Sequence, residues 1–321
     1  MYSNVGKVGV ILGGLSSERE VSLKSGHAII EALQKEGLIV KEIDLNTEKP
    51  KEVEHLIKGS GIDIAFIAMH GRFGEDGKLQ HILESINMVY IGSDSLASAL
   101  AMDKISSKRI FKEKNIPTPK YKILNKFDRD VSNFKSLGMP LVIKPKSQGS
   151  SIGVSFVNDI NDLEDAFKTA FSYDDSVIVE ECIDGVELTV GILDDHALEP
   201  IQIVSKSSFF DFKAKYTKGM TDYVLPADIN ERTRMLTQSL ALKAHKALGC
   251  RHFSRVDLMV DRDNNPYVLE VNTIPGFTST SLLPKAALYE GITFSQLCIR
   301  LINLALRDTV IHKDYLLSSK Q

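Results

Sequence analysis

The chain has 321 residues, of which 43% are hydrophobic and 25% are charged, and its formal net charge is −3. This length predicts about two domains, with a third if they are small. The near-balance of charge argues against a nucleic-acid partner. Three scattered cysteines, at 182, 250 and 298, lack metal-site spacing and indicate reduced thiols. With no signal peptide and no apolar stretch near the roughly 20 residues that span a bilayer, we expect a cytoplasmic protein with no membrane partner.

The first hundred residues alternate between strand and helix patterns. Strands are expected at 7–12, 39–45, 62–69 and 88–91. Because helical patterns such as 18–35 separate them, we expect a parallel sheet covered on both faces, in the Rossmann-like manner. Ligands of such sheets bind at the carboxyl ends of the strands, where Gly13-Gly14 and His70-Gly71 stand.

The remainder of the chain reads as α+β. After a proline-containing linker at 115–121, the expected elements are strands at 141–144, 154–157 and 176–181, with a helix at 162–171. A strand-rich region then begins at Val186, and a long helix follows at 230–248. The last expected helix covers 294–306, and the polar tail after it is expected to fray.

A hairpin near the C-terminus carries an unusual set of polar side chains. Strands 253–260 and 266–273 flank the turn sequence "DRDNN". Alternation puts Val256, Leu258 and Val260 on one face, with Leu269 and Val271 expected beside them. The opposite face then gathers Arg255, Asp257, Met259, Glu270 and Asn272.

That polar face admits two interpretations. A solvated sheet face, with Arg255 paired to the acids, is the usual explanation of alternating charge. Met259 and Asn272 are less typical of such a face. Two carboxylates and a carboxamide are hard oxygen donors of the kind that Mg²⁺ prefers, which favours a nucleotide-phosphate platform.

No P-loop motif is present, and Gly13-Gly14 lacks the third glycine of a dinucleotide fingerprint. A better phosphate site is "IKPKSQGSSIGV", where Lys144 ends a strand and a Gly/Ser loop offers backbone N–H groups. Taken alone, Lys144 is an exposed loop lysine, Lys104 a solvated helix residue, and Glu180 and Glu187 solvated strand ends. A metal platform elsewhere in the chain favours the functional interpretation of Lys144.

Four stretches in order, "HGRFGEDGKLQ", "KPKSQGSSIGV", "SRVDLMV" and "LEVNTIPGFTSTS", resemble the D-alanine–D-alanine ligases, a family of ATP-grasp enzymes. The resemblance runs from Gly9 to about Ala305. It departs from the family pattern at His81 and His252, where small residues are usual. The resemblance implies an ATP-grasp fold with an N-terminal Rossmann-like domain at 1–103, a central domain at 104–184 and a C-terminal domain at 185–321.

The resemblance also implies how ATP and metal are held. Asp257, Glu270 and Asn272 would bind two Mg²⁺ ions, for which Mn²⁺ can substitute. Lys104 and Lys144 would contact phosphates, Glu180 the adenine and Glu187 the ribose. The complete set implied to bind the nucleotide is Lys104, Lys144, Ser151, Glu180, Glu181, Ile183, Glu187 and Met259.

The resemblance further implies two D-alanine sites. Catalytic roles fall to Glu18, Ser150, Tyr216, Arg255, Gly276 and Ser281, and further substrate contacts to His70, Lys215 and Leu282. For two of these residues, Glu18 and His70, a purely structural role is an alternative. The Ser17–Glu20 spacing predicts a capping box at the start of the helix, which explains Glu20 well and Glu18 less well. His70 is equally well explained as a core or solvated histidine.

The implied reaction is ATP-dependent ligation of two D-alanine molecules through a D-alanyl phosphate, for peptidoglycan precursors. The resemblance also implies a homodimer. Related ligases that make D-alanyl-D-lactate or D-alanyl-D-serine are the nearest alternative. A nucleotide-binding oxidoreductase using the N-terminal sheet is the alternative from another class, and the incomplete glycine pattern argues against it.

The segment 209–223 contains Lys215 and Tyr216 and reads as a long loop, which the family uses as a lid that excludes water. Tyr216 resembles the branch of the family that makes the dipeptide. We therefore expect Tyr216→Phe to admit D-lactate or to weaken lid closure. Chromatography of the products formed from D-alanine with and without D-lactate checks this, and unchanged products and rates would exclude the lid role.

Overall fold

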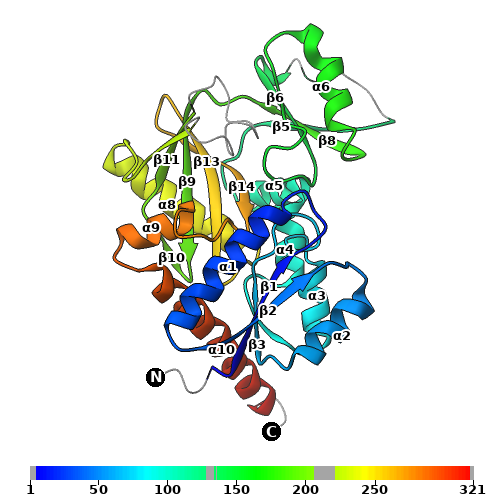
Figure 1. Ribbon diagram of the computed structural model, residues 1–321. Coiled ribbons are helices and arrows are strands. Elements are labelled where there is room, and N and C mark those ends of the chain that lie inside the picture. Colours follow the sequence, from blue (N-terminus) through cyan, green and yellow to red (C-terminus); the bar gives the residue numbers. More distant parts are fainter. Residues whose placement is uncertain (1–4, 128–133, 135, 206–220, 319–321) are drawn as a thin grey trace.

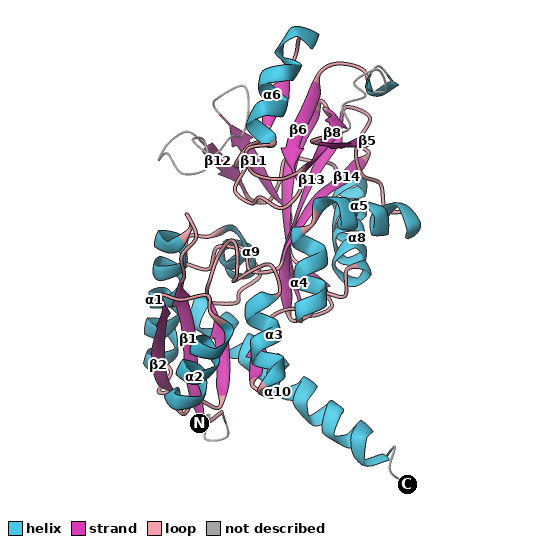
Figure 2. Ribbon diagram, turned by 90° about the vertical axis from the view of Figure 1, so that its right-hand side faces the viewer, coloured by secondary structure: helices cyan, strands magenta, loops and turns pink. Residues whose placement is uncertain are grey.

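The computed structural model describes residues 5–127, 134, 136–205 and 221–318, with the backbone alone at 309–318. It contains three sheets, each with its own helices (Figures 1 and 2). The sheets draw their strands from residues 7–91, 121–181 and 185–272 in turn. The boundaries that we assign to the three domains stay a prediction.

The N-terminal sheet has the parallel order that the alternating pattern predicts. Its strands lie in the order β2-β1-β3-β4, and all neighbouring pairs are parallel. Their bounds are β1 Lys7–Gly13, β2 Ile39–Leu45, β3 Ile64–Ile67 and β4 Val89–Ile91. The carboxyl ends of β1 and β3 therefore share one edge, and His70 and the loop before α1 (Arg19–Lys35) meet there.

Helices cover both faces of this sheet, because alternate residues of β1 point to opposite sides. Val8, Val10 and Leu12 pack with α1 and with apolar residues of the C-terminal helix α10 (Phe294–Ser318). Ile11 packs on the other face with α2 (Pro50–Ser60) and α3 (Lys78–Ser85). The expectation of a parallel sheet with two covered faces is confirmed.

Two antiparallel sheets form the rest of the molecule. The central sheet has the order β5-β8-β6-β7. Its elements are β5 Tyr121–Asn125, β6 Leu141–Pro145, β7 Ser155–Val157, β8 Ser176–Glu181 and the covering helix α6 Leu163–Ala170. The C-terminal sheet has the order β12-β11-β9-β13-β14, and β10 pairs with β9. Its strands are β9 Gly185–Leu193, β10 His196–Ala197, β11 Ile201–Ser205, β12 Thr221–Val224, β13 Phe253–Asp261 and β14 Pro266–Asn272.

Four further helices connect or cover these sheets. They are α4 Ser95–Met102, α5 Lys104–Glu113, α8 Glu231–Ala247 and α9 Leu282–Tyr289. Helix α8 packs on the apolar face of β13 and β14, where Val256, Leu258 and Val271 are buried. The opposite face of this hairpin is therefore left to polar residues and turns toward the central sheet (Figure 1).

The C-terminal helix departs from expectation. It continues to Ser318 instead of ending near Leu306, and its last part extends away from the body of the molecule (Figure 2). Contacts beyond Leu306 explain the extension. Arg307 pairs with both oxygens of Asp194 at 3.0 Å, and Asp308 pairs with His252 at 3.0 Å.

His252, one of the two departures from the family pattern, is buried and links Gly92 to Asp308 through hydrogen bonds. Its φ of 63° lies in the left-handed region that favours glycine. The N–H of Gly92 donates to Nδ1 at 3.0 Å, so Nε2 carries the proton and donates to Asp308. Burial lowers the pKa of His252, which favours this neutral ring. His81, the other departure, is exposed on α3.

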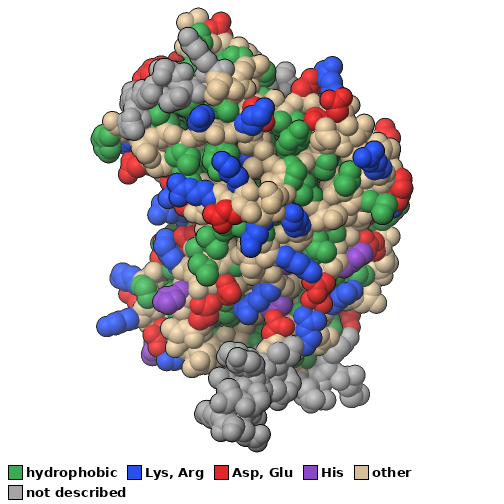
Figure 3. Space-filling view, turned by 180° about the vertical axis from the view of Figure 1, so that it is seen from behind, with side chains coloured by type: hydrophobic (Ala, Val, Ile, Leu, Met, Phe, Trp, Pro, Cys, Tyr) green, Lys and Arg blue, Asp and Glu red, His purple; other side chains and the backbone are tan. Residues whose placement is uncertain are grey.

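Among the described residues, no helix is long and apolar enough to cross a lipid bilayer. On the face shown in Figure 3, acidic and basic side chains are interspersed. The three cysteines are free thiols at separate positions.

The His252–Asp308 contact generates a stability prediction. Asp308→Ala should lower the free energy of unfolding by about 1–3 kcal/mol, because it leaves the buried Nε2–H of His252 without its acceptor. Asp308→Asn keeps an acceptor oxygen and should lose less. Urea denaturation measures both, and equal losses in the two variants would contradict the assigned hydrogen bond.

Candidate active site

Two cavities meet at the polar face of the β13–β14 hairpin. The larger, of about 550 Å³, lies between the central and C-terminal sheets. The smaller, of about 220 Å³, lies between the C-terminal sheet and the carboxyl edge of the N-terminal sheet. Asp257 and Glu270 line both cavities, so the two cavities adjoin at these carboxylates.

The structure brings nearly all the expected site residues to these walls. The larger cavity is lined by all eight residues expected to bind nucleotide: Lys104, Lys144, Ser151, Glu180, Glu181, Ile183, Glu187 and Met259. The smaller cavity is lined by Glu18, His70, Ser150, Arg255, Asn272, Gly276, Ser281 and Leu282. Lys215 and Tyr216 fall outside the described residues.

The hairpin register explains why the polar groups converge. Arg255 pairs with Asn272 and Asp257 with Glu270 across the antiparallel ladder, so all four side chains share one face. One detail of the expected register is wrong. A bulge after Asp257 pairs Leu258 with Val268, which takes the core position, and Leu269 turns instead into the wall of the larger cavity.

Four hydrogen bonds hold Asp257 in place. Arg255 donates to it from Nε at 2.9 Å and from Nη2 at 2.8 Å. Asn272 donates through Nδ2 at 3.1 Å, and the hydroxyl of Thr189 on β9 donates at 2.6 Å. Burial opposes the charge of Arg255, but Asp257 and the nearby Glu270 outweigh it and raise the pKa of Arg255. Asp257 is therefore fixed in position beside a permanent cation.

The donor set suits a hard divalent cation. Asp257, Glu270 and Asn272 supply carboxylate and carboxamide oxygens from one sheet face, and Asn272 turns its nitrogen to Asp257, which leaves its oxygen available. Within the described residues, no group of three or more His, Cys, Asp or Glu side chains gathers as a metal site. Two carboxylates and one amide fit Mg²⁺, which takes few protein ligands, better than Zn²⁺ or another soft-ligand ion.

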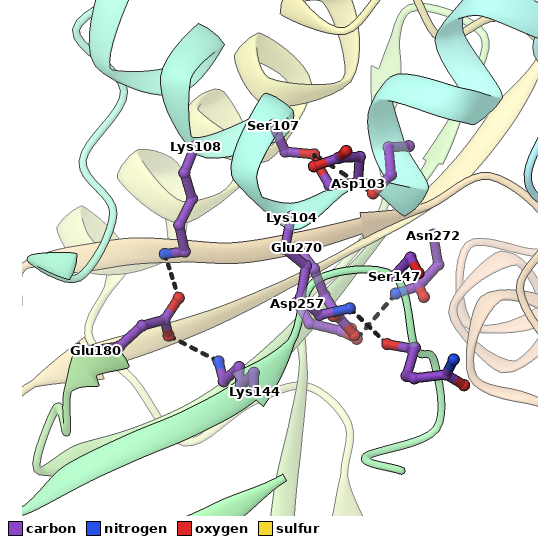
Figure 4. A network of polar contacts seen from close by, with 12 residues as sticks. Asp103, Lys104, Ser107, Lys108, Lys144, Ser147, Glu180, Asp257, Glu270 and Asn272 are labelled. Carbon is purple, nitrogen blue, oxygen red and sulfur yellow. Dashed lines mark hydrogen bonds and ion pairs between the residues drawn. The ribbon is translucent and has the colours of Figure 1, made fainter. Parts of the chain in front are cut away.

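Lys104 reaches the site because helices α4 and α5 break at Asp103. The Asp103 side chain caps α5 by accepting the N–H of Ser106 at 3.0 Å, which places Lys104 in the first turn. The Lys104 ammonium donates to the carbonyl of Gln148 at 2.6 Å and lies 3.2 Å from Glu270 (Figure 4). Lys104 is 8% exposed, so the alternative of a solvated helix lysine is wrong.

Glu180 is held between two ammonium groups. Lys144 and Lys108 each lie 2.8 Å from its carboxylate, from opposite sides (Figure 4). Burial alone would raise the pKa of Glu180, but the two lysines outweigh it and lower that pKa. Glu180 is 1% exposed, so the alternative of a solvated strand end is wrong for this residue. Lys108 escaped the sequence analysis, although it follows Lys104 by one helical turn.

The Gly/Ser loop is tied at both ends. Asp174 accepts the N–H and the hydroxyl of Ser147, both at 2.8 Å. Ser150 donates to Glu18 at 2.5 Å, which joins the loop to the start of α1. Ser150 and Ser151 have φ values of 51° and 58°, a left-handed conformation that non-glycine residues adopt at a cost. Strained backbone held by external contacts is typical of a ligand-binding loop.

The expected capping box at the start of α1 is absent from the described structure. The N-cap is Glu18, and no side chain caps the helix there. Instead, the N–H of Glu18 donates to the hydroxyl of Ser16 at 3.2 Å, and that hydroxyl donates to the carbonyl of His70. The side chain of Glu18 is thus directed to Ser150 and the smaller cavity.

His70 is a buried connector whose ring nitrogens both have protein partners. Nδ1 donates to the carbonyl of Ile274 at 2.9 Å, and Nε2 accepts from the hydroxyl of Ser25 at 2.9 Å. The hydroxyl of Ser25 accepts the N–H of Phe277 at 3.2 Å. The core-histidine alternative therefore accounts for these contacts, and the ring also forms part of the wall beside Gly276.

Glu75 is a site residue that the sequence analysis missed, although it lies inside the quoted "HGRFGEDGKLQ". It lines the smaller cavity, is 16% exposed, and lies 3.3 Å from His70 Nδ1. Desolvation, together with the charge of Glu18, raises the pKa of Glu75. A carboxyl group with a raised pKa in a cleft is typical of a functional site.

Comparison with known proteins decides the family. The model described as D-ala D-ala ligase C-terminus matches residues 110–303, and the one described as D-ala D-ala ligase N-terminus matches residues 41–93. The chain is 44% identical over 318 residues to a D-alanine–D-alanine ligase of Pelotomaculum thermopropionicum, covering 96% of this chain and 99% of that one. The chain belongs to the D-alanine–D-alanine ligase family.

Further relatives agree with this family membership. A D-alanine–D-alanine ligase of Carboxydothermus hydrogenoformans is 46% identical, covering 94% of this chain and 98% of that one. The crystal structure of the Bacillus anthracis ligase complexed with ATP superposes with a TM-score of 0.84 at 37% identity, covering 94% and 98% of the two chains. The D-Ala:D-Ser ligase VanG of Enterococcus faecalis gives 0.82 at 32% identity, covering 94% and 99%. The expected ATP-grasp fold of this family is confirmed.

Glu75 in this ligase-family site generates a pH prediction. Its raised pKa means that the folded state binds the proton more tightly than the unfolded chain, so stability is lost as pH rises through the folded pKa. Glu75→Gln removes this loss. The free energy of unfolding of the variant, relative to the parent protein, should therefore increase from pH 5 to pH 8. Chemical denaturation measures the difference, with exposed Glu20→Gln as control, and a flat difference would contradict the assignment.

Proposed function

We propose that this chain joins two D-alanine molecules to form D-alanyl-D-alanine while ATP is converted to ADP and phosphate, and that the product serves peptidoglycan synthesis. One observation carries the proposal: Asp257 and Glu270 line both the larger and the smaller cavity. A nucleotide in the larger cavity would have its terminal phosphate at the point where an amino acid in the smaller cavity begins.

The larger cavity is proposed to hold ATP. Lys104, at the junction, faces the phosphate end, and the loop that carries Ser151 offers backbone N–H groups. Lys144 lies between this end and Glu180. The base and ribose side is assigned to Glu180, Glu181, Ile183, Glu187 and Met259, of which Met259 pairs with Glu187 across strands β13 and β9.

Two Mg²⁺ ions, or Mn²⁺ in their place, are proposed to be held by Asp257, Glu270 and Asn272. Such ions supply charge neutralisation of the phosphate oxygens. The contribution of the protein is a rigid set of oxygens, because the sheet and the donors from Arg255 and Thr189 fix Asp257 in place.

The ligation needs an activated carboxylate. Transfer of the γ-phosphoryl group to the first D-alanine gives an acyl phosphate, the amine of the second D-alanine attacks it, and phosphate leaves from the tetrahedral intermediate. Placement and charge stabilisation supply most of the catalysis. Arg255 and the N–H of Gly276 line the smaller cavity and are proposed to stabilise the oxyanion, each donor of this kind contributing about 3–4 kcal/mol.

The two amino acids are assigned to opposite walls of the smaller cavity. Glu18 is proposed to bind the ammonium group of the first D-alanine. Ser150 holds the carboxylate of Glu18 in place. Ser281 is the N-cap of α9, and no side chain caps this helix, so the N–H of Leu282 lies at a helix start that attracts a carboxylate. This end is proposed to bind the carboxylate of the second D-alanine. His70 is proposed to shape the wall between them.

The raised pKa of Glu75 makes it a candidate acceptor for the proton released during ligation. Glu75 faces the same cavity and holds a proton more readily than an ordinary carboxyl group. We propose that it accepts the proton that the ammonium group of the second D-alanine loses before its amine attacks. We further propose that Lys215 and Tyr216 close the site. The protein is proposed to be a homodimer and to be located in the cytoplasm.

The nearest alternatives use another second substrate, D-lactate or D-serine. The D-Ala:D-Ser ligase VanG is structurally similar, but it is less identical to this chain than the two D-alanine–D-alanine ligases described above. Measurement of ADP release with D-alanine, alone and mixed with D-serine, D-lactate or L-alanine, tests the proposal. ADP release that requires D-serine or D-lactate would overturn it.

Glu270→Gln tests the shared carboxylate. We expect ADP release to fall by at least about a thousandfold, because several kcal/mol of charge stabilisation depends on this group. Circular dichroism should show an intact fold, and calorimetric titration with Mn²⁺ should show weaker binding. Glu290→Gln, at the C-terminal end of α9, is the matched control. Normal ADP release by Glu270→Gln would remove the metal assignment.

A further inference from the structure

Tyr223 is an aromatic residue that the proposed reaction leaves without a role. It lies on β12, at the edge of the C-terminal sheet, and it lines the smaller cavity. Tyr223 is 37% exposed, and a single exposed aromatic residue on an edge strand is ordinary in folded proteins. Its place in the strand register and the contact of its ring argue for a function instead.

The strand register places Tyr223 in the same row as residues that line both cavities. Tyr223 pairs with Ile203 on β11, which pairs with Glu187 on β9. Glu187 in turn pairs with Met259 on β13. Side chains of directly paired residues lie on the same face of a sheet. Glu187 and Met259 line the larger cavity and Ile203 lines both cavities, so Tyr223 belongs to the face of the sheet that bounds the site.

A lysine of α9 holds the ring of Tyr223. The ammonium of Lys285 lies 4.9 Å from the ring centre, which is a cation–π contact. Lys285 stands one turn after the N-cap Ser281, and its N–H donates to the carbonyl of Ser281 at 2.9 Å. Helical side chains lean toward the N-terminus of their helix, so that of Lys285 leans back over the start of α9. The contact therefore places the ring beside the end of the cavity that is assigned to the second D-alanine.

The smaller cavity leaves little room beside this ring. It measures about 220 Å³ and is proposed to hold two amino acids. At the α9 end its other lining residues are Thr280, Ser281 and Leu282, all smaller than Tyr223. Burial raises the pKa of Tyr223, and the charge of Arg255 acts against this rise, so the ring also lies near the proposed oxyanion donor. A fixed ring in a small space selects ligands by size, because one extra methylene changes selectivity by about 10- to 200-fold.

We propose that Tyr223 is a specificity-determining residue, whose ring limits the side chain of the second amino acid to about the size of a methyl group, and that Lys285 is the positioning residue that holds this ring. The inference rests on the proposed function in one respect, the assignment of the start of α9 to the carboxylate of the second substrate. The carboxylate and the side chain of an amino acid share one carbon atom. Fixing the carboxylate at Leu282 therefore keeps the side chain close to the wall that Tyr223 forms.

Turnover of a mixture of D-alanine and D-2-aminobutyrate, which is longer by one methylene, tests the wall. Tandem mass spectrometry of the dipeptides identifies the residue at each position. Tyr223→Val should raise the ratio of D-2-aminobutyrate to D-alanine at the C-terminal position by about tenfold. The N-terminal position should not change, because the first amino acid is assigned to the opposite wall. Val224→Ala, the next residue of β12 and on the opposite face, should leave both positions unchanged.

Variants of Lys285 test how the ring is held. Lys285→Met should raise the same C-terminal ratio by about threefold, because the ring stays but loses its cation, whereas Lys285→Arg keeps a cation over the ring and should match the parent protein. In the Tyr223→Val background, Lys285→Met should add nothing. Valine suits an edge strand, so circular dichroism should show an intact fold. Equal changes at both dipeptide positions, or an unchanged C-terminal position in Tyr223→Val, would overturn the inference.

Calorimetry of the full chain with ADP and dipeptides separates this inference from the proposed function, because it needs no turnover. The ligands are D-alanyl-D-alanine and D-alanyl-D-2-aminobutyrate. If the parent protein prefers the first, Tyr223→Val loses that preference and D-alanine supports no ADP release, the proposed function fails while the role of Tyr223 stands. If D-alanine supports ADP release and Tyr223→Val keeps the full preference, the role of Tyr223 alone is wrong.

Discussion

Two carboxylates directly opposite each other in one antiparallel hairpin set the main constraint on this structure. Asp257 and Glu270 pair across β13 and β14, where like charges repel. Arg255 neutralises the first in a two-point contact, and Lys104 approaches the second from α5. The second of these contacts crosses from the C-terminal sheet to a helix outside it. The charge balance at the hairpin therefore depends on a helix from outside the C-terminal sheet.

Three polar contacts then close the space around the hairpin. Glu18 holds Ser150, so the start of α1 fixes the loop of the central sheet. Lys104 holds the carbonyl of Gln148 in the same loop. His70 joins the carboxyl edge of the N-terminal sheet to the carbonyl of Ile274, just before Gly276. Because each contact joins segments far apart in sequence, the walls of the two cavities form only when all three sheets are in place.

Features that depend on residues close together in the sequence could be predicted, whereas contacts between residues far apart in the sequence could not. Alternation placed Arg255, Asp257 and Asn272 on one face, which is correct because it depends on strand geometry alone. The bulge that turns Leu269 into the cavity adds one residue to a strand, and the amino-acid composition of the strand does not reveal it. Lys108 and Glu75 look like ordinary surface charges until the fold buries them. The extension of α10 depends on Asp194 and His252, over fifty residues upstream.

Charge counting around the junction explains why such a site would need a divalent cation. Lys104, Lys108, Lys144 and Arg255 are the cations, and Glu180, Asp257 and Glu270 are the acids that pair with them. Glu187 lines the same cavity and interacts with Lys144, which makes four acids against four cations, so no net positive charge is left for an incoming polyphosphate. Lysines that are already engaged by carboxylates contribute little further neutralisation in a partly buried site. A polyphosphate would therefore have to arrive with its own cations, and the carboxylates that hold the lysines in place are also the oxygen donors that those cations require.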